Sequence, residues 1–128
     1  LASIMKDYTD YQPYLSETHH TQKLDAPSGT AIHLANDLIE KGIVNDWHYP
    51  AKEANAGQLP IDAYREEDVK GTHELTYESD IDTIQIKHKA KTRDGFALGA
   101  VIAAEWLHHK KTSGIFTMQN VLKDPIKS

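Results

Sequence analysis

The sequence predicts an α+β fold in which a mixed, mostly antiparallel sheet carries helices packed on one face. The prediction depends on the order of the expected elements, which is helix, strand, helix, several strands and helix. Apolar residues recur at helical spacing in separate segments, and apolar and polar residues alternate in the segments between them. A length of 128 residues suits one domain.

The chain is expected to start with a helix and a strand. Apolar residues at the beginning follow helical spacing, so residues 1 to about 10 are predicted to be the end of an amphipathic helix. Because position 1 is not methionine, we interpret this start as a cut through a longer protein. Residues 14–19 are predicted to form a short strand, and residues 23–30, which include a proline and a glycine, to form a turn.

The second helix has clear start and stop signals. Ser28 is expected to be its N-cap, and Lys41 followed by Gly42 is a typical helix end. Between them lies one apolar stripe at helical spacing, formed by Ile32, Ala35, Leu38 and Ile39.

The middle of the chain is expected to supply most of the sheet. Residues 43–60 show little periodicity and are predicted to be a loop. Residues 61–65 are predicted to be a strand, and the alternation in residues 72–79 and 82–90 indicates an antiparallel hairpin.

The last clear helix is expected over residues 96–109, and one further short turn is expected after Thr112. Its apolar stripe consists of Phe96, Ala100, Ala103 and Leu107.

The composition excludes several classes of protein. Without cysteine the chain has no disulfide framework, no thiolate zinc site and no cysteine nucleophile, which fits a reducing cytoplasm. A formal net charge of -5 predicts no broad attraction to nucleic acid or anionic lipid. No run of 18 apolar residues occurs, so no membrane span is expected.

Two histidines and a lysine lie within five residues at the end of the first expected strand. Adjacent residues of a strand point to opposite faces, so His19 and His20 share a pocket only if the strand ends there. A histidine exchanges protons near neutral pH, and Lys23 adds a positive charge. A histidine of this kind, taken alone, is more often a surface or core residue than a catalytic one, and a lone lysine is most often a solvated charge.

The start of the second helix is a candidate anion site, at Ser28, Gly29 and Thr30. Free backbone N–H groups and the helix dipole attract an anion there, and a glycine lets a ligand approach the backbone. With the neighbouring lysine and histidines, this start describes a site for a small carboxylate beside a proton donor. The alternative is that Ser28 is only an N-cap and Gly29 only a turn residue.

A metal site is not expected. Four histidines could supply nitrogen ligands, namely His19, His20, His73 and His88. No pair has the His-x-x-x-His spacing of one helical face, and no cysteine is present.

Three blocks of the sequence resemble the dihydrodipicolinate reductases, also called 4-hydroxy-tetrahydrodipicolinate reductases. Residues 17–31 match the pattern Glu-x-His-His-x-x-Lys-x-Asp-Ala-Pro-Ser-Gly-Thr-Ala. Residues 65–73 resemble Arg-x-Gly-Asp-Ile-Val-Gly-x-His, with Glu67 in place of the glycine and Lys70 at an apolar position. Residues 86–100 resemble Ile-Thr-His-Lys-Ala-x-Ser-Arg followed by Phe-Ala-x-Gly-Ala.

The resemblance implies roles for individual residues. His19 matches a proposed acid/base residue, and Lys23 matches the lysine proposed to protonate the substrate after hydride transfer. The residues that match those holding the substrate carboxylates are His20, Lys23, Ser28, Gly29 and Thr30. Arg93 and Phe96 match a region close to the active site and are expected to contact the cofactor.

The resemblance also implies cofactor and partners. The chain is expected to be a substrate-binding and oligomerisation domain for a small dicarboxylate, to form a cytoplasmic homotetramer through its sheet, and to use NADH or NADPH. That nucleotide would be bound mainly by an N-terminal Rossmann domain outside these residues, so the chain alone is expected to be inactive. Two other functions stay open: a carboxylate-binding module without chemistry, and a purely structural assembly domain.

Overall fold

The computed structural model describes residues 1–124. The chain divides into two compact units, a sheet unit (Leu1–Lys91) and a helical unit (Thr92–Ser128). The sheet unit contains most of the candidate site residues, namely His19, His20, Lys23, Ser28, Gly29 and Thr30.

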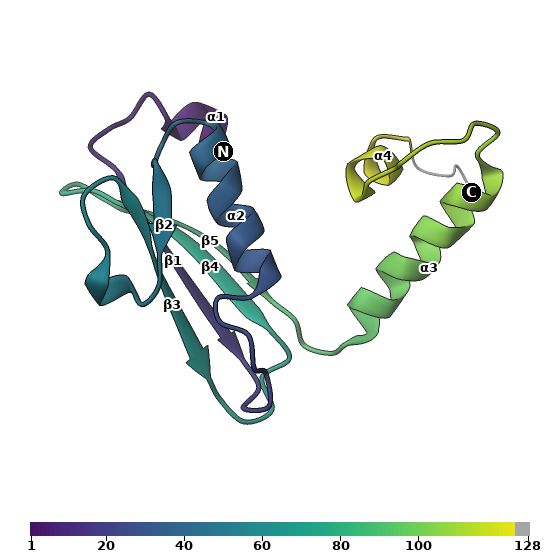
Figure 1. The fold of residues 1–128 in the computed structure, drawn as a ribbon, viewed down its shortest axis with the longest axis horizontal. Coiled ribbons are helices and arrows are strands. Elements are labelled where there is room, and N and C mark those ends of the chain that lie inside the picture. The colour runs from purple at the N-terminus through teal and green to yellow at the C-terminus, as the bar shows by residue number, and fades with distance from the viewer. Residues whose placement is uncertain (125–128) are drawn as a thin grey trace. The chain divides into compact units, whose positions relative to one another are not determined.

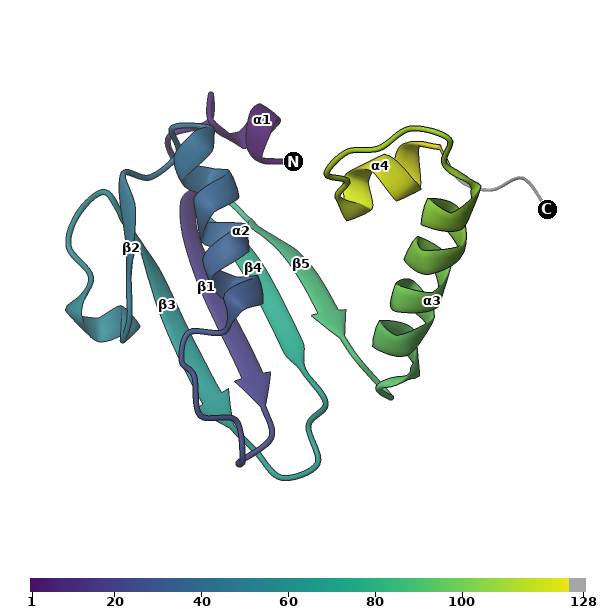
Figure 2. The same cartoon turned by 45° about the vertical axis from the view of Figure 1, so that its right-hand side comes forward.

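The sheet unit is built on a five-stranded sheet with the spatial order β2-β3-β1-β4-β5 (Figures 1 and 2). The central strand β1 (Gln12–His19) pairs in parallel with β3 (Gln58–Arg65) and antiparallel with β4 (Thr72–Glu78). At the edges, β5 (Thr83–Lys89) runs antiparallel to β4 and β2 (Asp46–His48) runs parallel to β3. The antiparallel pairings extend over more residues than the parallel ones, so the predicted mixed, mostly antiparallel sheet is confirmed.

One face of the sheet is covered by α2 (Gly29–Glu40), which runs along the strands in both views (Figures 1 and 2). Ser28 is its N-cap, as predicted, and the chain leaves the helix at Gly42 with φ +72°, a conformation that glycine adopts without strain. The most deeply buried residues of α2 are Ala31, Ala35 and Leu38.

A single hydrophobic core lies between α2 and the sheet. Leu15 of β1 is fully buried at its centre and lies between Ile61 of β3 and Leu75 of β4. The other core residues are Met5, Ala31, Ala35, Leu38, Val44, Leu59 and Tyr77.

Two predictions for the sheet unit were wrong. The first helix, α1 (Ala2–Met5), is only one turn, because the polar residues that follow it offer no apolar face to bury. The predicted loop at residues 43–60 contains β2, a short 3-10 helix (Ala51–Glu53) and the beginning of β3. The two strand segments are held by parallel pairing with each other, which leaves no periodic signal in so short a segment.

The helical unit consists of α3 (Asp94–His109) and α4 (Met118–Lys123). Trp106 is its buried residue on α3, and its indole Nε1–H donates to the carbonyl of Asp124 (2.7 Å). The predicted apolar stripe of α3 is not the buried face within this chain, since Phe96 and Leu107 are 57% and 54% exposed. Trp106 is buried instead because it packs edge-to-face on Phe116 and has an acceptor for its N–H. No helix within residues 1–124 is both long and apolar enough to cross a membrane.

Candidate active site

The face of β1 that looks toward α2 changes from apolar to polar along the strand. Alternation places Leu15, Glu17 and His19 on this one face, and all three are buried. In the antiparallel register Glu17 lies opposite His73 of β4. The strand ends at His19, whose Cα partner on the parallel strand is Arg65, the last residue of β3. The carboxyl ends of two parallel strands therefore meet at the polar end of this face.

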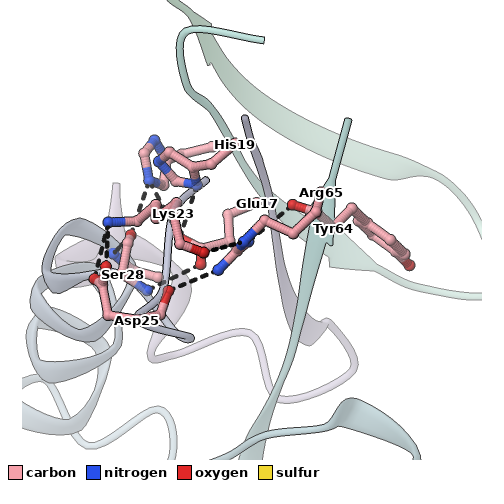
Figure 3. A network of polar contacts seen from close by, with 9 residues as sticks. Glu17, His19, Lys23, Asp25, Ser28, Tyr64 and Arg65 are labelled. Atoms are coloured by element: carbon pink, nitrogen blue, oxygen red, sulfur yellow. Dashed lines mark hydrogen bonds and ion pairs between the residues drawn. The ribbon is translucent and has the colours of Figure 1, made fainter. Parts of the chain in front are cut away.

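Glu17 connects the start of α2 with two histidines (Figure 3). Its Oε1 accepts a hydrogen bond from the Ser28 backbone N–H (2.9 Å). Its Oε2 lies 3.4 Å from Nε2 of His73 and 3.8 Å from Nδ1 of His19. Burial by itself raises the pKa of the Glu17 carboxyl, but the nearby His73 ring and the polar groups of Ser28 outweigh this effect and hold the pKa below its ordinary value.

His19 is the other buried titratable residue of the cluster, and its ring meets the ring of His73 edge-to-face with centroids 5.0 Å apart. Burial lowers the pKa of His19, and the electrostatic effects of His73, Lys23 and Arg65 lower it further, against an opposing effect of Glu17. The imidazole is therefore held toward its neutral form.

The turn after β1 carries Lys23 and is fixed by an arginine (Figure 3). Lys23 Nζ contacts both carboxylate oxygens of Asp25 (2.7 and 2.8 Å), and this ammonium group holds the pKa of the Asp25 carboxyl below its usual value. Arg65 donates to the backbone carbonyls of Lys23 (3.1 Å), Asp25 (2.6 Å) and Tyr64 (2.8 Å). The guanidinium group thus holds the turn in place through its main chain.

The start of α2 offers free donors beside this turn. Ser28 is buried, and its Oγ accepts from the backbone N–H of Ala31 (3.2 Å) and lies 3.2 Å from Nε2 of His73. The hydrogen bonds of residues 1–124 leave the backbone N–H groups of Gly29 and Thr30 without an acceptor. Both residues are exposed, and no atom lies within 4 Å of where a Cβ of Gly29 would be, so a ligand can reach these amides.

The structure gathers most of the predicted site residues at one end of the sheet unit. These residues are His19, Lys23, Ser28, Gly29 and Thr30. His20 follows the end of β1, and its backbone carbonyl accepts from Lys23 N–H (3.1 Å). Arg93 and Phe96 lie at the start of α3 in the helical unit, and both are exposed. The roles assigned to all of these residues stay predictions.

Four residues of the cluster were not predicted to act in substrate binding or catalysis, although all of them belong to the resembling blocks: Glu17, Asp25, Arg65 and His73. One signal was present for Glu17, because a residue two positions before His19 points to the same face of a strand. The position of His73 depends on the register between β1 and β4, which no local pattern indicates.

Three residues of the cluster have the donor types of a metal site. One atom each from Glu17, His19 and His73 lies within 4.8 Å of the others. Ser28 already contacts both Glu17 and His73, so we interpret the group as a hydrogen-bonded cluster. The expectation that the chain binds no metal stays a prediction.

Comparisons of the sequence and of the fold with known proteins all lead to dihydrodipicolinate reductases. The family described as "Dihydrodipicolinate reductase, C-terminus" matches residues 1–122. The chain is 52% identical over 129 residues to the 4-hydroxy-tetrahydrodipicolinate reductase of Christiangramia forsetii, covering 100% of this chain and 52% of the relative. It is 38% identical over 120 residues to the reductase of the same name from Methanosarcina acetivorans, covering 91% of this chain and 45% of the relative.

A solved structure shares the fold. The dipicolinate-bound dihydrodipicolinate reductase from Paenisporosarcina sp. TG-14 superposes with a TM-score of 0.67 at 22% identity, covering 94% of this chain and 50% of that one. The chain therefore spans about half the length of the relatives that it matches. Because the family match extends over nearly all of the sequence, the chain belongs to the family of dihydrodipicolinate reductase C-terminal domains.

Proposed function

We propose that this chain is the substrate-binding and catalytic half of a 4-hydroxy-tetrahydrodipicolinate reductase. The reaction would be the NADH- or NADPH-dependent reduction of 4-hydroxy-tetrahydrodipicolinate to tetrahydrodipicolinate, a step of lysine and diaminopimelate synthesis. Two findings support the proposal. The chain belongs to the reductase C-terminal family, and a relative with this enzyme name matches it over its whole length.

One observation carries the proposal: a cation, an acid/base group and free backbone donors meet at one end of the sheet. Lys23 lies in the turn after β1, His19 ends that strand, and the first amides of α2 are open. A planar dicarboxylate needs donors on its carboxylates and a positive charge near its ring, and this end of the sheet unit supplies both.

The chain's own residues would divide the work. The N–H groups of Gly29 and Thr30, with the Ser28 hydroxyl, hold one carboxylate at the positive end of α2 and so fix the ring. Lys23 Nζ stabilises the negative charge that develops on the substrate and donates a proton to it, and His19 acts as the acid/base group. When bound, a nicotinamide nucleotide supplies the hydride.

The described residues do not form a complete site for that nucleotide. A dinucleotide site places Gly-x-Gly-x-x-Gly between a strand and a helix, and the sequence contains no such pattern. Arg93 and Phe96 are exposed at the start of α3 and are our proposed contacts from this chain. We place the remaining contacts in a Rossmann domain outside these residues, because the relatives are about twice as long as the matched region.

We also propose a cytoplasmic homotetramer that forms through the sheet. The face opposite α2 carries Tyr14, Asp62 and Tyr64, joined by hydrogen bonds from both phenols to one carboxylate oxygen (3.0 and 3.3 Å). The long helix α2 lies on the other face (Figures 1 and 2), and the short 3-10 helix meets this one at Asp62, whose Oδ1 accepts from Ala51 N–H (3.2 Å). A second sheet packed on this face would bury it.

Calorimetry with pyridine-2,6-dicarboxylate (dipicolinate) tests the proposal directly. We expect the 128-residue chain to bind this planar mimic, and Lys23→Ala to weaken the affinity by roughly tenfold or more, about 1.4 kcal/mol. Lys87→Ala is the matched control, because Lys87 pairs with Glu74 (2.7 Å) on the opposite face of the sheet and should leave the affinity unchanged.

The outcome separates the remaining functions. Equal binding by wild type and Lys23→Ala would favour a module that holds carboxylates without chemistry. Absence of binding in the chain, and also in a protein that joins it to its nucleotide domain, would contradict the reductase assignment.

A further inference from the structure

Two buried polar atoms of the candidate site face each other without a hydrogen bond. Oε2 of Glu17 and Nδ1 of His19 are both inaccessible to solvent, and neither has a hydrogen-bond partner among residues 1–124. They lie 3.8 Å apart. Burying a carboxylate oxygen and a ring nitrogen without partners costs free energy, so a pair this close gains when the gap closes.

The other contacts of Glu17 aim its free oxygen at the histidines. Oε1 is held by the Ser28 backbone N–H (2.9 Å), and the Cα register sets Glu17 opposite His73. His73 Nε2 lies within reach of Ser28 Oγ (3.2 Å) and is 3.4 Å from Oε2. His73 Nε2 thus has Ser28 Oγ as a hydrogen-bond partner, whereas Nδ1 of His19 has no hydrogen-bond partner among residues 1–124.

The opposite side of the His19 ring is open by comparison. Nδ1 is buried, so the 11% of the side chain that remains exposed lies elsewhere on it. Gly71 borders that side: a Cβ added to it would lie 3.5 Å from Nε2, and its φ of +145° is one that other residues rarely adopt. A glycine at this place keeps a methyl group away from Nε2.

We propose that Glu17 is the positioning residue of His19: its Oε2 accepts a hydrogen bond from Nδ1–H, which leaves Nε2 as the nitrogen that exchanges the proton. This inference rests on the proposed function, since it names the reacting atom of the same site. A carboxylate accepts only, so the pair fixes the neutral ring with its proton on Nδ1 and its lone pair on Nε2. The same carboxylate also holds the N-cap of α2, so the proton-exchanging group and the anion-binding amides share one support.

Nitrogen-15 NMR of the histidine rings tests the proposal in the 128-residue chain. Above its pKa, neutral His19 should show a protonated Nδ1 and an unprotonated Nε2. In Glu17→Gln the pKa of His19 should move to a lower pH, because the charge that opposes the effects of burial, His73, Lys23 and Arg65 is removed. Glutamine keeps the oxygen that accepts from Ser28 N–H, so the helix start should be retained.

Glu74→Gln is the matched control, a glutamate-to-glutamine change on the neighbouring strand whose carboxylate pairs with Lys87 on the other face. It should leave the His19 titration unchanged. A proton on Nε2 of His19 in the wild type, or the same titration in wild type and Glu17→Gln, would overturn the proposal. If Glu17→Gln does not fold, the wild-type ring spectrum decides alone.

Dipicolinate calorimetry on the same samples keeps the two proposals apart. Binding of dipicolinate together with a proton on Nε2 would refute the positioning role and leave the reductase function standing. A proton on Nδ1 with the expected shift in Glu17→Gln, but no dipicolinate binding by this chain or by a protein that joins it to its nucleotide domain, would support the positioning and count against the function.

Discussion

Two positions that follow each other on the same face of β1 are almost completely buried, but they contribute to the free energy of folding in opposite ways. Leu15 lies between Ile61 and Leu75 in the register of the sheet, and its surroundings are apolar. Two residues further on, Glu17 lies opposite His73 and is 1% exposed. One position stabilises the fold, and the other carries a group whose burial costs free energy unless it is paired.

The difference shows that burial alone does not distinguish core from site. The alternation of the strand predicts correctly that both side chains point inward. Only the residue type separates them, because an unpaired carboxylate oxygen in a core works against folding. Substitutions at the apolar end should therefore act on stability, and substitutions at the polar end on ligand binding and protonation.

The largest expected effect on stability comes from the apolar end. Leu15→Ala should lower the free energy of unfolding by about 2–5 kcal/mol, because it removes fully buried methyl groups and leaves a cavity. Urea unfolding followed by circular dichroism measures it. Leu24→Ala is the control, since Leu24 is 97% exposed and should change little. Equal stabilities for the two variants would break the comparison.

Acidification should have a smaller effect, and it should come from the polar end. The folded chain holds the pKa of Glu17 below 4.5 and that of His19 below 6.5. The unfolded chain then binds more protons, so stability is lost as the pH falls below 6.5 and again below 4.5. Unfolding curves from pH 7 to pH 3 should show a weaker loss below 4.5 in Glu17→Gln than in wild type. A steeper loss in the variant would contradict the ionised, buried carboxylate.

The smallest effect on stability is expected at the start of α2. Gly29→Ala meets no atom within 4 Å, and alanine favours a helix over glycine by up to about 1 kcal/mol. Dipicolinate affinity should nevertheless fall by roughly tenfold, because the added methyl group occupies space at the open amides. Gly95→Ala in α3 is a matched control without neighbours within 4 Å. Undiminished affinity in Gly29→Ala would move the carboxylate site away from this helix start.

Much of the sheet unit could be predicted from local signals. Ser28 as N-cap, Gly42 after the helix and the hairpin of β4 and β5 all follow from neighbouring residues. Both β2 and the beginning of β3 were missed, because they depend on parallel pairing with each other, which leaves no local periodic pattern. In the helical unit, the buried residue of α3 is Trp106 and not the predicted apolar stripe. Its burial depends on Phe116 and on the carbonyl of Asp124.

The candidate site divides in the same way. The residues that one segment brings together, His19, Lys23 and Ser28, could be named from the sequence. The residues that hold them in place could not be named from the sequence. His73 lies on β4 and Arg65 on β3, and only the register of the sheet brings them to the site.

The contacts of Arg65 have a consequence for how the turn after β1 tolerates change. All of its hydrogen bonds to this turn end on main-chain carbonyls, those of Lys23 and Asp25. Every amino acid carries such a carbonyl, so side chains in the turn can be replaced without loosening its attachment to the sheet. The turn is thus a place where substrate preference can be redesigned while Arg65 keeps its attachment to the sheet.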